Sequence, residues 1–408
     1  MGNNHFGRRR FLKAAGSAPL VSMMALKASA EPNQSGAKEG EKAEESKLPQ
    51  RKLGRADIKV PVLSNGMMFN VMENQIILRA NLKHNVTYWD TAWGYAGGNS
   101  ELGIGEFFKR EPESRKEVFL VTKASRSRTV EQKEARLQES LKRMNTDYID
   151  LYYGLHGCSS PKQLNGELAE WAESAKKRKL IRYFGFSTHK NMEECMMAAS
   201  KLGWIDAIMP KYNISEMQKP KMQEAVQACS DAGIALIAMK VLRGVQKQKT
   251  EAEEKLLNHF TAKGYTPAQA KIKAVLEDER FCCACVRMNN IALLKEDVAA
   301  VLDKTKLAAD DIEVLNNYSK ETCSGYCAGC GEICERAVPE MPYVSDVMRY
   351  LMYYNSYGDT ERAKQMFSEL PIKARRGLTG ADYRLAEARC PQRMPIAKLM
   401  SEAAQKLA

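Results

Sequence analysis

Short apolar runs alternate with amphipathic stretches between residues 51 and 303, and this alternation constrains the fold more than any other feature. The apolar runs have the length and composition of buried strands, whereas the stretches between them have the periodicity of helices. The predicted strands are residues 62–69, 86–90, 118–122, 148–153, 181–186, 207–209, 234–239 and 281–286. Helices are predicted at 130–144, 161–179, 219–232 and 291–303, among others. This order predicts an α/β fold, a parallel (β/α)8 TIM barrel.

Four polar residues stand near the carboxyl ends of predicted strands. Asp90 and Tyr95 follow the run 86–90, Lys123 follows 118–122, and His156 follows 148–153. In a parallel barrel these ends open onto one face, where active sites are built. Each residue alone also suits a structural role, as a helix cap, a loop aromatic or a barrel-rim residue. Together the four predict a catalytic site.

These residue types suit the reduction of a carbonyl group, which requires a proton at oxygen when hydride reaches carbon. A tyrosine hydroxyl can deliver that proton, although a free phenol has a pKa of about 10. We expect the ammonium of Lys123 to lower the pKa of Tyr95, and Asp90 to keep Lys123 charged. We expect His156 to orient the carbonyl oxygen by hydrogen bonding.

The spacing and surroundings of the four residues resemble the aldo/keto reductase family, whose catalytic Asp, Tyr, Lys and His would fall on them. The likeness extends over residues 51–303. Residues 51–55 resemble the hairpin that closes the barrel floor in this family, and residues 180–189 resemble its fifth strand. Tyr212-Asn213 and residues 238–244 resemble the segments after strands six and seven. The resemblance implies NADP(H) as cofactor and a small carbonyl compound as substrate.

The cofactor segments depart from the family pattern. Met209 stands where the family has Gln, Met239 where it often has Tyr, and Thr188 where it has Asn. Arg287 replaces a Gly of the phosphate turn, and a guanidinium there can bind phosphate bidentately. Asp297 replaces an Asn on the adenosine side. The cofactor-binding residues that the resemblance implies are Ser187, Thr188, Met209, Met239, Lys240, Arg287 and Asn289.

The N-terminus has the features of a twin-arginine export signal. Arg8-Arg9 precedes Phe-Leu-Lys and a modest apolar region, and Ala28-Ser-Ala30 suits cleavage. The alternative is a basic N-terminal helix of a cytosolic protein. We predict a signal peptide at 1–30, a disordered Lys/Glu-rich linker at 31–50, and a periplasmic or cell-envelope location. No run of 18 apolar residues exists, so no integral membrane segment is predicted.

The formal net charge is +12, but the charged residues are mixed along the chain. A surface that binds nucleic acid is expected to have a basic stripe interleaved with aromatic residues, and the sequence contains no such stripe. Nucleic acid is therefore not a predicted partner.

The cysteines form two groups. Those of the barrel, which lie in apolar segments, are predicted to pack in the core: Cys158, Cys195, Cys229, Cys282, Cys283 and Cys285. The others are Cys323, Cys327, Cys330, Cys334 and Cys390, with the spacing C-x3-C-x2-C-x3-C followed by a distant Cys-Pro. This spacing is typical of ferredoxin-type [4Fe–4S] ligands.

Residues 306–408 resemble the α-helical, ferredoxin-like extension that one branch of the family carries. In ferredoxins the Cys that precedes Pro ligates the cluster of the other motif. By this analogy the favoured ligands are Cys323, Cys327, Cys330 and Cys390, and the alternative set has Cys334 in place of Cys323. A zinc site and a disulfide-linked tail remain as alternatives.

The chain is therefore predicted to be an exported NADP(H)-dependent aldo/keto-reductase-like oxidoreductase with one [4Fe–4S] cluster, having residues 51–305 as its barrel. The alternative is a non-catalytic barrel that serves as an electron-transfer or scaffold subunit. Nicotinamide delivers two electrons together whereas one cluster passes them singly, so the cluster is either structural or exchanges electrons with a protein partner.

Overall fold

The computed structural model describes residues 47–212, 214–242, 251–322, 327, 329–357 and 359–408. The predicted signal peptide, nearly all of the predicted linker, and Cys323 lie outside the described residues.

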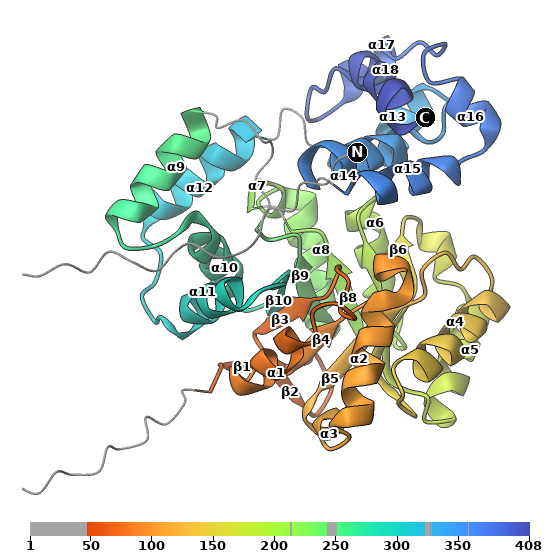
Figure 1. The fold of residues 1–408 in the computed structure, drawn as a ribbon. Helices are drawn as coiled ribbons and strands as arrows, with labels where there is room; N and C mark the ends of the chain where they lie inside the picture. Colours follow the sequence, from red (N-terminus) through yellow and green to blue (C-terminus); the bar gives the residue numbers. More distant parts are fainter. Residues whose placement is uncertain (1–46, 213, 243–250, 323–326, 328, 358) are drawn as a thin grey trace, which may run out of the picture. The chain divides into compact units, whose positions relative to one another are not determined.

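Eight parallel strands close into a barrel in the order β10-β3-β4-β5-β6-β7-β8-β9, which confirms the predicted fold (Figure 1). All neighbouring strands pair in the parallel sense. The strands are β3 (Leu63–Gly66), β4 (Tyr88–Asp90), β5 (Phe119–Lys123), β6 (Ile149–Cys158), β7 (Ile181–Thr188), β8 (Ala207–Pro210), β9 (Ala235–Met239) and β10 (Phe281–Val286). Each lies within one or two residues of its predicted start, and β6 is longer than expected.

Helices cover the outside of the barrel. They are α1 (Ile76–Lys83), α2 (Asn99–Arg110), α3 (Ser114–Glu117), α4 (Val130–Arg143), α5 (Gly166–Lys177), α6 (Met192–Ala199), α7 (Ile214–Met217), α8 (Pro220–Asp231), α9 (Glu251–Ala262), α10 (Pro267–Glu277) and α11 (Ile291–Leu302).

Local chemistry sets the starts of these helices. Thr129 and Gln132 form a capping box that begins α4. The single helix predicted at 161–179 is instead a short 3₁₀ turn, η2 (Pro161–Gln163), followed by α5. The break occurs because Asn165 caps α5, its side chain accepting a hydrogen bond from the Leu168 N–H at 3.0 Å.

A short hairpin closes the floor of the barrel, as predicted. Its strands are β1 (Gln50–Lys52) and β2 (Lys59–Pro61). Arg51 donates to the Phe281 carbonyl at 2.6 Å, where β10 begins. Gly54 has a φ of +53°, and a Cβ there would lie 2.3 Å from the Gly233 carbonyl oxygen, so only glycine fits this approach. Leu53 packs in the interior of the barrel.

Two apolar layers stabilise the barrel, one inside it and one between strands and helices. Cys282, Cys283 and Cys285 belong to the inner layer, and Cys158, Cys195 and Cys229 to the outer one. All six thiols are buried and none forms a disulfide, which confirms their prediction as core residues.

The C-terminal extension has its own apolar core, built by α13 (Gly331–Ala337), α14 (Val344–Tyr357), α15 (Thr360–Ser368), α16 (Ile372–Arg376), α17 (Arg384–Arg389) and α18 (Ile396–Leu407). Every regular element described beyond residue 305 is helical. By contrast, α12 (Ala309–Thr322) buries Leu315 and Tyr318 against Leu256 and Phe260 of α9. The extension's core therefore begins near Cys334, and α12 packs with the helices of the barrel.

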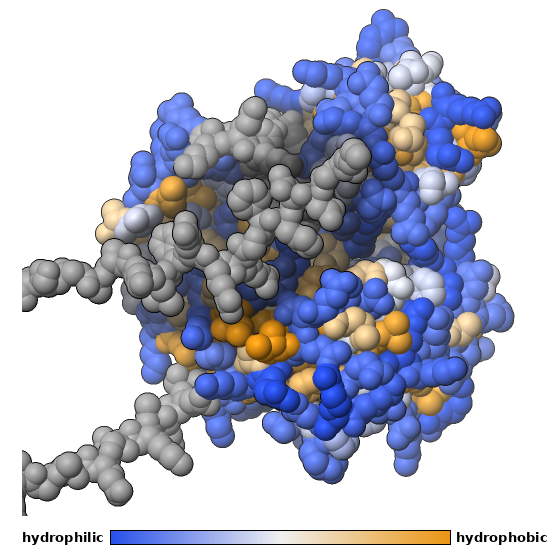
Figure 2. Space-filling model, viewed as in Figure 1, coloured by the Kyte–Doolittle hydropathy of each residue, from blue (hydrophilic) through white to orange (hydrophobic). Residues whose placement is uncertain are grey.

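Apolar side chains are mostly inside, and the face seen in Figure 2 is largely hydrophilic with small apolar patches. In the part of the chain that the structure describes, no helix combines the length and apolarity needed to cross a bilayer.

Candidate active site and cysteine site

The carboxyl ends of the strands carry the predicted catalytic residues into one cavity of about 400 Å³, called here the central cavity. Asp90 and Lys123 are the last residues of β4 and β5, and His156 lies near the end of β6. Tyr95 begins the short turn η1 (Tyr95–Gly98) after β4. All four line the cavity, so the structure brings together the residues that the sequence predicted.

Asp90 and Lys123 form a buried ion pair at the base of the cavity. The Lys123 Nζ lies 2.5 Å from Asp90 Oδ1 and donates to the Thr91 carbonyl at 2.7 Å. Burial raises the pKa of Asp90, and the neighbouring ammonium opposes this rise. Burial lowers the pKa of Lys123, but the negative charge of Asp90 acts in the opposite direction and the net direction is upward. Lys123 is therefore a permanent ammonium near neutral pH.

Tyr95 lies beside this ammonium, with the Lys123 Nζ 5.2 Å from the ring centre. Burial raises the pKa of Tyr95, while Lys123 and Arg362 act in the opposite direction. Lys123 thus acts on the Tyr95 pKa in the expected direction, but the loss of hydration is the larger effect and the net direction is upward. Tyr95 is consequently protonated at neutral pH, as a proton donor must be.

His156 faces Tyr95 edge-on, with the ring centres 5.8 Å apart. Two irregularities in the pairing of β6 with β7 flank it, at Tyr153/Leu155 and at His156/Cys158, and such bulges redirect side chains. Burial lowers the pKa of His156 well below its usual value, and the cations Lys123 and Arg362 lower it further. The imidazole is therefore neutral.

Ser125 orients this imidazole. Its Oγ lies 2.7 Å from His156 Nδ1 and accepts a hydrogen bond from the Gly94 N–H at 3.3 Å. Because the serine oxygen already accepts one bond, its own proton is available for Nδ1. This arrangement favours the tautomer that carries its proton on Nε2.

The predicted cofactor residues divide into two groups. Ser187, Met209, Met239, Lys240 and Arg287 line the central cavity. In the described part of the chain, the Ser187 Oγ is buried without a hydrogen-bond partner.

Thr188 and Asn289 do not belong to that lining. The Thr188 hydroxyl donates to the Cys158 carbonyl at 2.8 Å. The Asn289 carbonyl accepts a hydrogen bond from Asn74 at 2.6 Å. Both residues therefore support the strand ends and the loop around the cavity.

Sequence reasoning missed the contribution of the C-terminal extension. Tyr353 of α14 and Arg362 of α15 line the central cavity together with the barrel residues. The Arg362 guanidinium carbon lies 5.4 Å from the centre of the Tyr95 ring and 5.1 Å from that of Tyr353. The Tyr353 ring lies between the two parts of the chain, 4.9 Å from Lys240 Nζ of the barrel and 5.1 Å from the Arg362 guanidinium carbon. No local pattern distinguishes Arg362 from the other charged residues of an amphipathic helix.

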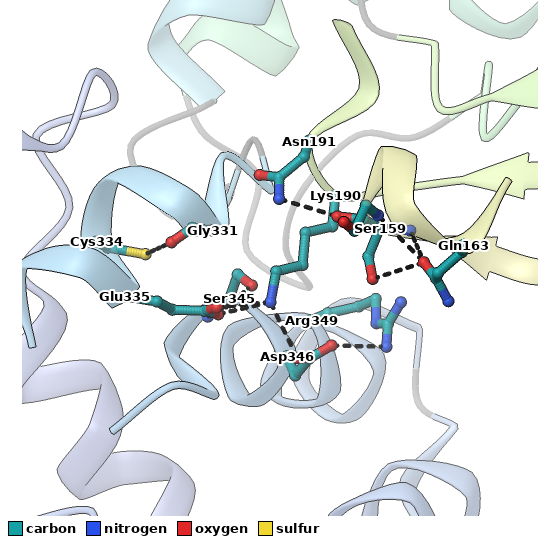
Figure 3. Close-up of polar contacts among 11 residues, drawn as sticks. Ser159, Gln163, Lys190, Asn191, Gly331, Cys334, Glu335, Ser345, Asp346 and Arg349 are labelled. Carbon is teal, nitrogen blue, oxygen red and sulfur yellow. Dashed lines mark hydrogen bonds and ion pairs between the residues drawn. The ribbon is translucent and has the colours of Figure 1, made fainter. Parts of the chain in front are cut away.

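An ion-pair network attaches the extension to the barrel (Figure 3). Lys190, just after β7, lies 2.7 Å from Glu335 and 3.4 Å from Asp346. Asp346 in turn pairs with Arg349 at 3.1 Å. Gly329 has a φ of +82°, and a Cβ there would lie 1.9 Å from the His189 carbonyl oxygen, so the backbones meet closely. These contacts place α14 and α15 at the mouth of the barrel.

The cysteines of the extension meet in a second, largely apolar cavity, called here the cysteine cavity. Cys327, Cys330, Cys334 and Cys390 all line it, together with side chains such as Val344, Met348 and Met394. Cys323 lies outside the described residues. The four described thiols of the extension thus share one cavity, and they include Cys334 of the alternative set.

Comparison with known proteins agrees with this geometry. The model of the aldo/keto reductase family matches residues 65–315. The aldo-keto reductase yakc [NADP(+)] of Schizosaccharomyces pombe is 29% identical over 217 aligned residues, and the match covers 47% of this chain and 60% of that protein. The uncharacterized oxidoreductase YqkF of Bacillus subtilis is 24% identical over 315 residues, covering 67% of this chain and 97% of its own.

The solved structures give the same fold. An aldo-keto reductase of Bacillus halodurans in its holo form superimposes with a TM-score of 0.55 at 24% identity, covering 67% of this chain and 96% of its own. The chain belongs to the aldo/keto reductase family, a family of oxidoreductases. The family match ends at residue 315, before the cysteine-rich segment and the helices that bear Tyr353 and Arg362.

Proposed function

We propose that this protein is an exported, NADP(H)-dependent reductase of small carbonyl compounds that carries one [4Fe–4S] cluster. The convergence of Asp90, Tyr95, Lys123 and His156 on one cavity is the observation that carries the reductase proposal. The name of the yakc relative, which includes NADP(+), supports the choice of cofactor.

The central cavity suits a nicotinamide dinucleotide. The unpartnered Ser187 Oγ is a hydrogen-bonding group for the carboxamide, and a buried hydroxyl without a partner is costly unless a ligand supplies one. Lys240 and Arg287 line the same cavity and suit phosphate groups. Met209 and Met239 present polarizable sulfur to a ring. When bound, NADPH supplies a hydride to the carbonyl carbon.

The residues of the chain supply the proton and align the carbonyl group. Tyr95 donates its proton to the carbonyl oxygen, and the ammonium of Lys123 stabilises the phenolate that remains. Asp90 holds Lys123 in place and charged. His156, neutral and held by Ser125, donates from Nε2 to the carbonyl oxygen and so aligns it. Solvent returns the proton to Tyr95, which also lines the outer groove described below.

Replacing Tyr95 tests the reductase proposal. We expect Tyr95→Phe to lower kcat by orders of magnitude while NADPH binding, followed by nicotinamide fluorescence, is unchanged. Tyr354→Phe removes a hydroxyl outside the central cavity and serves as the matched control. Full turnover by Tyr95→Phe would contradict the proposal, as would a wild-type protein that binds no NADPH.

The cysteine cavity supports the cluster proposal. Its donor set of four thiols suits an iron–sulfur cluster or zinc. The spacing C-x2-C-x3-C of Cys327, Cys330 and Cys334, with Cys390 further along the chain, is typical of ferredoxin-type ligands and favours the cluster. Such a cluster supplies one-electron transfer when bound.

Iron analysis tests this assignment. We expect Cys327→Ser to abolish iron and visible absorption in anaerobically purified protein. Cys229→Ala, which changes a buried thiol of the barrel core, should retain both. Stoichiometric zinc without iron in the wild-type protein would refute the cluster.

The twin-arginine segment supports export to the periplasm or cell envelope, since that route carries proteins that have already folded around a cofactor. We expect Arg8→Lys with Arg9→Lys to leave the protein in the cytoplasm, as fractionation and immunoblotting would report. Export of this variant would exclude the twin-arginine route.

An electron-transfer or scaffold subunit is the second candidate. It is favoured by Met209 and Met239, which stand where the family has Gln and often Tyr on the nicotinamide side of the cavity. An anaerobic NADPH titration separates the candidates. Saturable binding supports the reductase, whereas no binding up to millimolar NADPH favours a protein electron partner.

A further inference from the structure

The central cavity carries an excess of positive charge. Among the described residues that line it, Asp90 is the only carboxylate, whereas Lys123, Lys240, Arg287 and Arg362 are cationic. Asp90 neutralises Lys123 through their 2.5 Å ion pair. Cationic side chains therefore outnumber acidic ones in the lining of this cavity, which favours anionic ligands.

The two histidines of the cavity do not add to this charge, but they respond to it. Burial lowers the pKa of His156 and of His189 well below the usual value, and the charged groups that lower each further are cations of the barrel and of the extension. Both rings are neutral mainly because they are buried, and the cations around them act in the same direction.

The cations lie in different parts of the cavity. Lys240 and Arg287 follow β9 and β10, where the cofactor phosphates are proposed to bind. Arg362 instead reaches in from α15 and lies beside Tyr95, whose hydroxyl is the proposed proton donor. Arg362 is therefore on the substrate side of the cavity.

The environment of Arg362 leaves its donors incompletely used. The guanidinium lies near the rings of Tyr95 and Tyr353, and Nη1 contacts the sulfur of Met68, a weak acceptor. Its ion pair with Asp359 is 4.0 Å long, beyond hydrogen-bonding distance. A guanidinium held between aromatic rings is well suited to bind a carboxylate or phosphate bidentately.

Acidic residues do occur nearby, in the outer groove of about 840 Å³ that continues from the central cavity past Tyr95 and Arg362. Asp359, Glu361 and Glu369 line that groove and not the central cavity. Glu369 is paired with Arg126 at 3.2 Å. An anion that enters from the groove thus meets Arg362 beside Tyr95.

We propose that Arg362 of the C-terminal extension is a substrate-specificity residue, which binds a carboxylate or phosphate group of the carbonyl substrate beside Tyr95. This inference rests on the proposed reductase function and gives its substrate class: small anionic aldehydes or ketones. The same side chain gives the extension a direct role in the active site of the barrel.

The test compares anionic substrates with matched neutral ones in the full-length holoprotein. The pairs are pyruvate with methyl pyruvate, and glyceraldehyde 3-phosphate with glyceraldehyde, which separate a carboxylate from a phosphate source. We expect Arg362→Met to lower kcat/KM for the anionic member of the preferred pair about 10- to 100-fold, as for a lost charge-assisted hydrogen bond. The neutral member should change less than about threefold, since it makes no such bond.

Two further variants sharpen the comparison. Arg362→Lys keeps the positive charge but loses the planar guanidinium that binds an anion bidentately. We expect it to retain part of the preference for the anionic substrate that Arg362→Met loses. Arg376→Met removes an exposed arginine of the same extension and should leave both substrates unchanged. Loss of Arg362 also changes the field at Tyr95, but that effect acts on both substrates, so the anionic-to-neutral ratio isolates binding. An unchanged ratio would overturn the inference.

Failure of the proposed function is distinguishable from failure of this inference. A wild-type enzyme that reduces only the neutral members retains the reductase function but refutes the anion site. If no substrate is reduced, calorimetric binding of oxalate and of inorganic phosphate decides. Binding that Arg362→Met abolishes supports the site, and absence of binding to the wild-type protein overturns it.

Discussion

Removal of Lys123 should destabilise the fold in a strongly pH-dependent way, because Asp90 is buried and bonded to it. The two side chains are 1% and 3% exposed, and Asp90 Oδ2 has no hydrogen-bond partner among the described residues. In Lys123→Met the carboxyl group must either remain charged without a partner or bind a proton. Breaking a buried ion pair from one side costs about 3–5 kcal/mol.

Protonation sets a ceiling on this cost. An unfolded-state carboxyl has a pKa of about 3.9, so protonating Asp90 at pH 7 costs about 4 kcal/mol, at roughly 1.4 kcal/mol per pH unit. At pH 5 the same step costs only about 1.5 kcal/mol. In folded Lys123→Met the Asp90 carboxyl has a raised pKa. The stability of this variant therefore falls as the pH rises above the pKa that the carboxyl has in the unfolded state. The destabilisation should therefore be larger at pH 7 than at pH 5.

The double variant Asp90→Asn with Lys123→Met is the control. It removes the buried charge altogether, and we expect it to recover most of the lost stability and to lose the pH dependence. Neither variant should reduce a carbonyl, because Tyr95 no longer has its ammonium. Thermal unfolding of wild type and both variants, followed by circular dichroism at pH 5 and pH 7, measures the effect. Equal losses at both pH values, or a double variant less stable than Lys123→Met, would refute the reasoning.

Three further outcomes are expected. Burial raises the pKa of Asp297 to about 7, so the folded state binds a proton that the unfolded state has lost, and stability falls as pH rises from about 4 through 7. Asp297→Asn should unfold at a higher temperature than wild type at pH 8 and at a similar one at pH 4 by calorimetry; parallel curves would contradict this. Ser125→Ala should lower kcat about tenfold without unfolding the protein, and ¹⁵N NMR of His156 should report a mixed tautomer in place of a single one. Lys190→Met should increase amide hydrogen exchange in α13 and α14 but not in the barrel, because Glu335 loses its partner; uniform exchange would show that this ion pair does not attach the extension.

The barrel and the placement of the four proposed catalytic residues were predictable because the relevant information is local. A strand of five residues and a helix of fourteen differ in period, so their order is readable from a single chain. Asp90 and Lys123 end their strands, and a parallel barrel carries all such ends to the same face. Convergence of the four proposed catalytic residues therefore followed from topology alone.

Other features depended on contacts between distant segments. α12 was assigned by position to the extension, yet its apolar face packs on α9. The direction of the Tyr95 pKa depends on how much burial outweighs Lys123, and no spacing of residues contains that balance. The presence of Cys334 in the cysteine cavity likewise depends on how α13 and the Cys390 segment pack.

The sequence by itself determined which elements form and which chemistry the barrel presents, since periodicity and strand ends are short-range properties. Only the tertiary structure decided that a helix lying more than 200 residues after Tyr95 places Arg362 over it. That placement depends on Lys190, Glu335 and Asp346, whose ion pairs join the extension to the end of β7. Such pairs are specific in three dimensions but are ordinary charges in the sequence, so the shape and charge of the completed site became visible only in the fold.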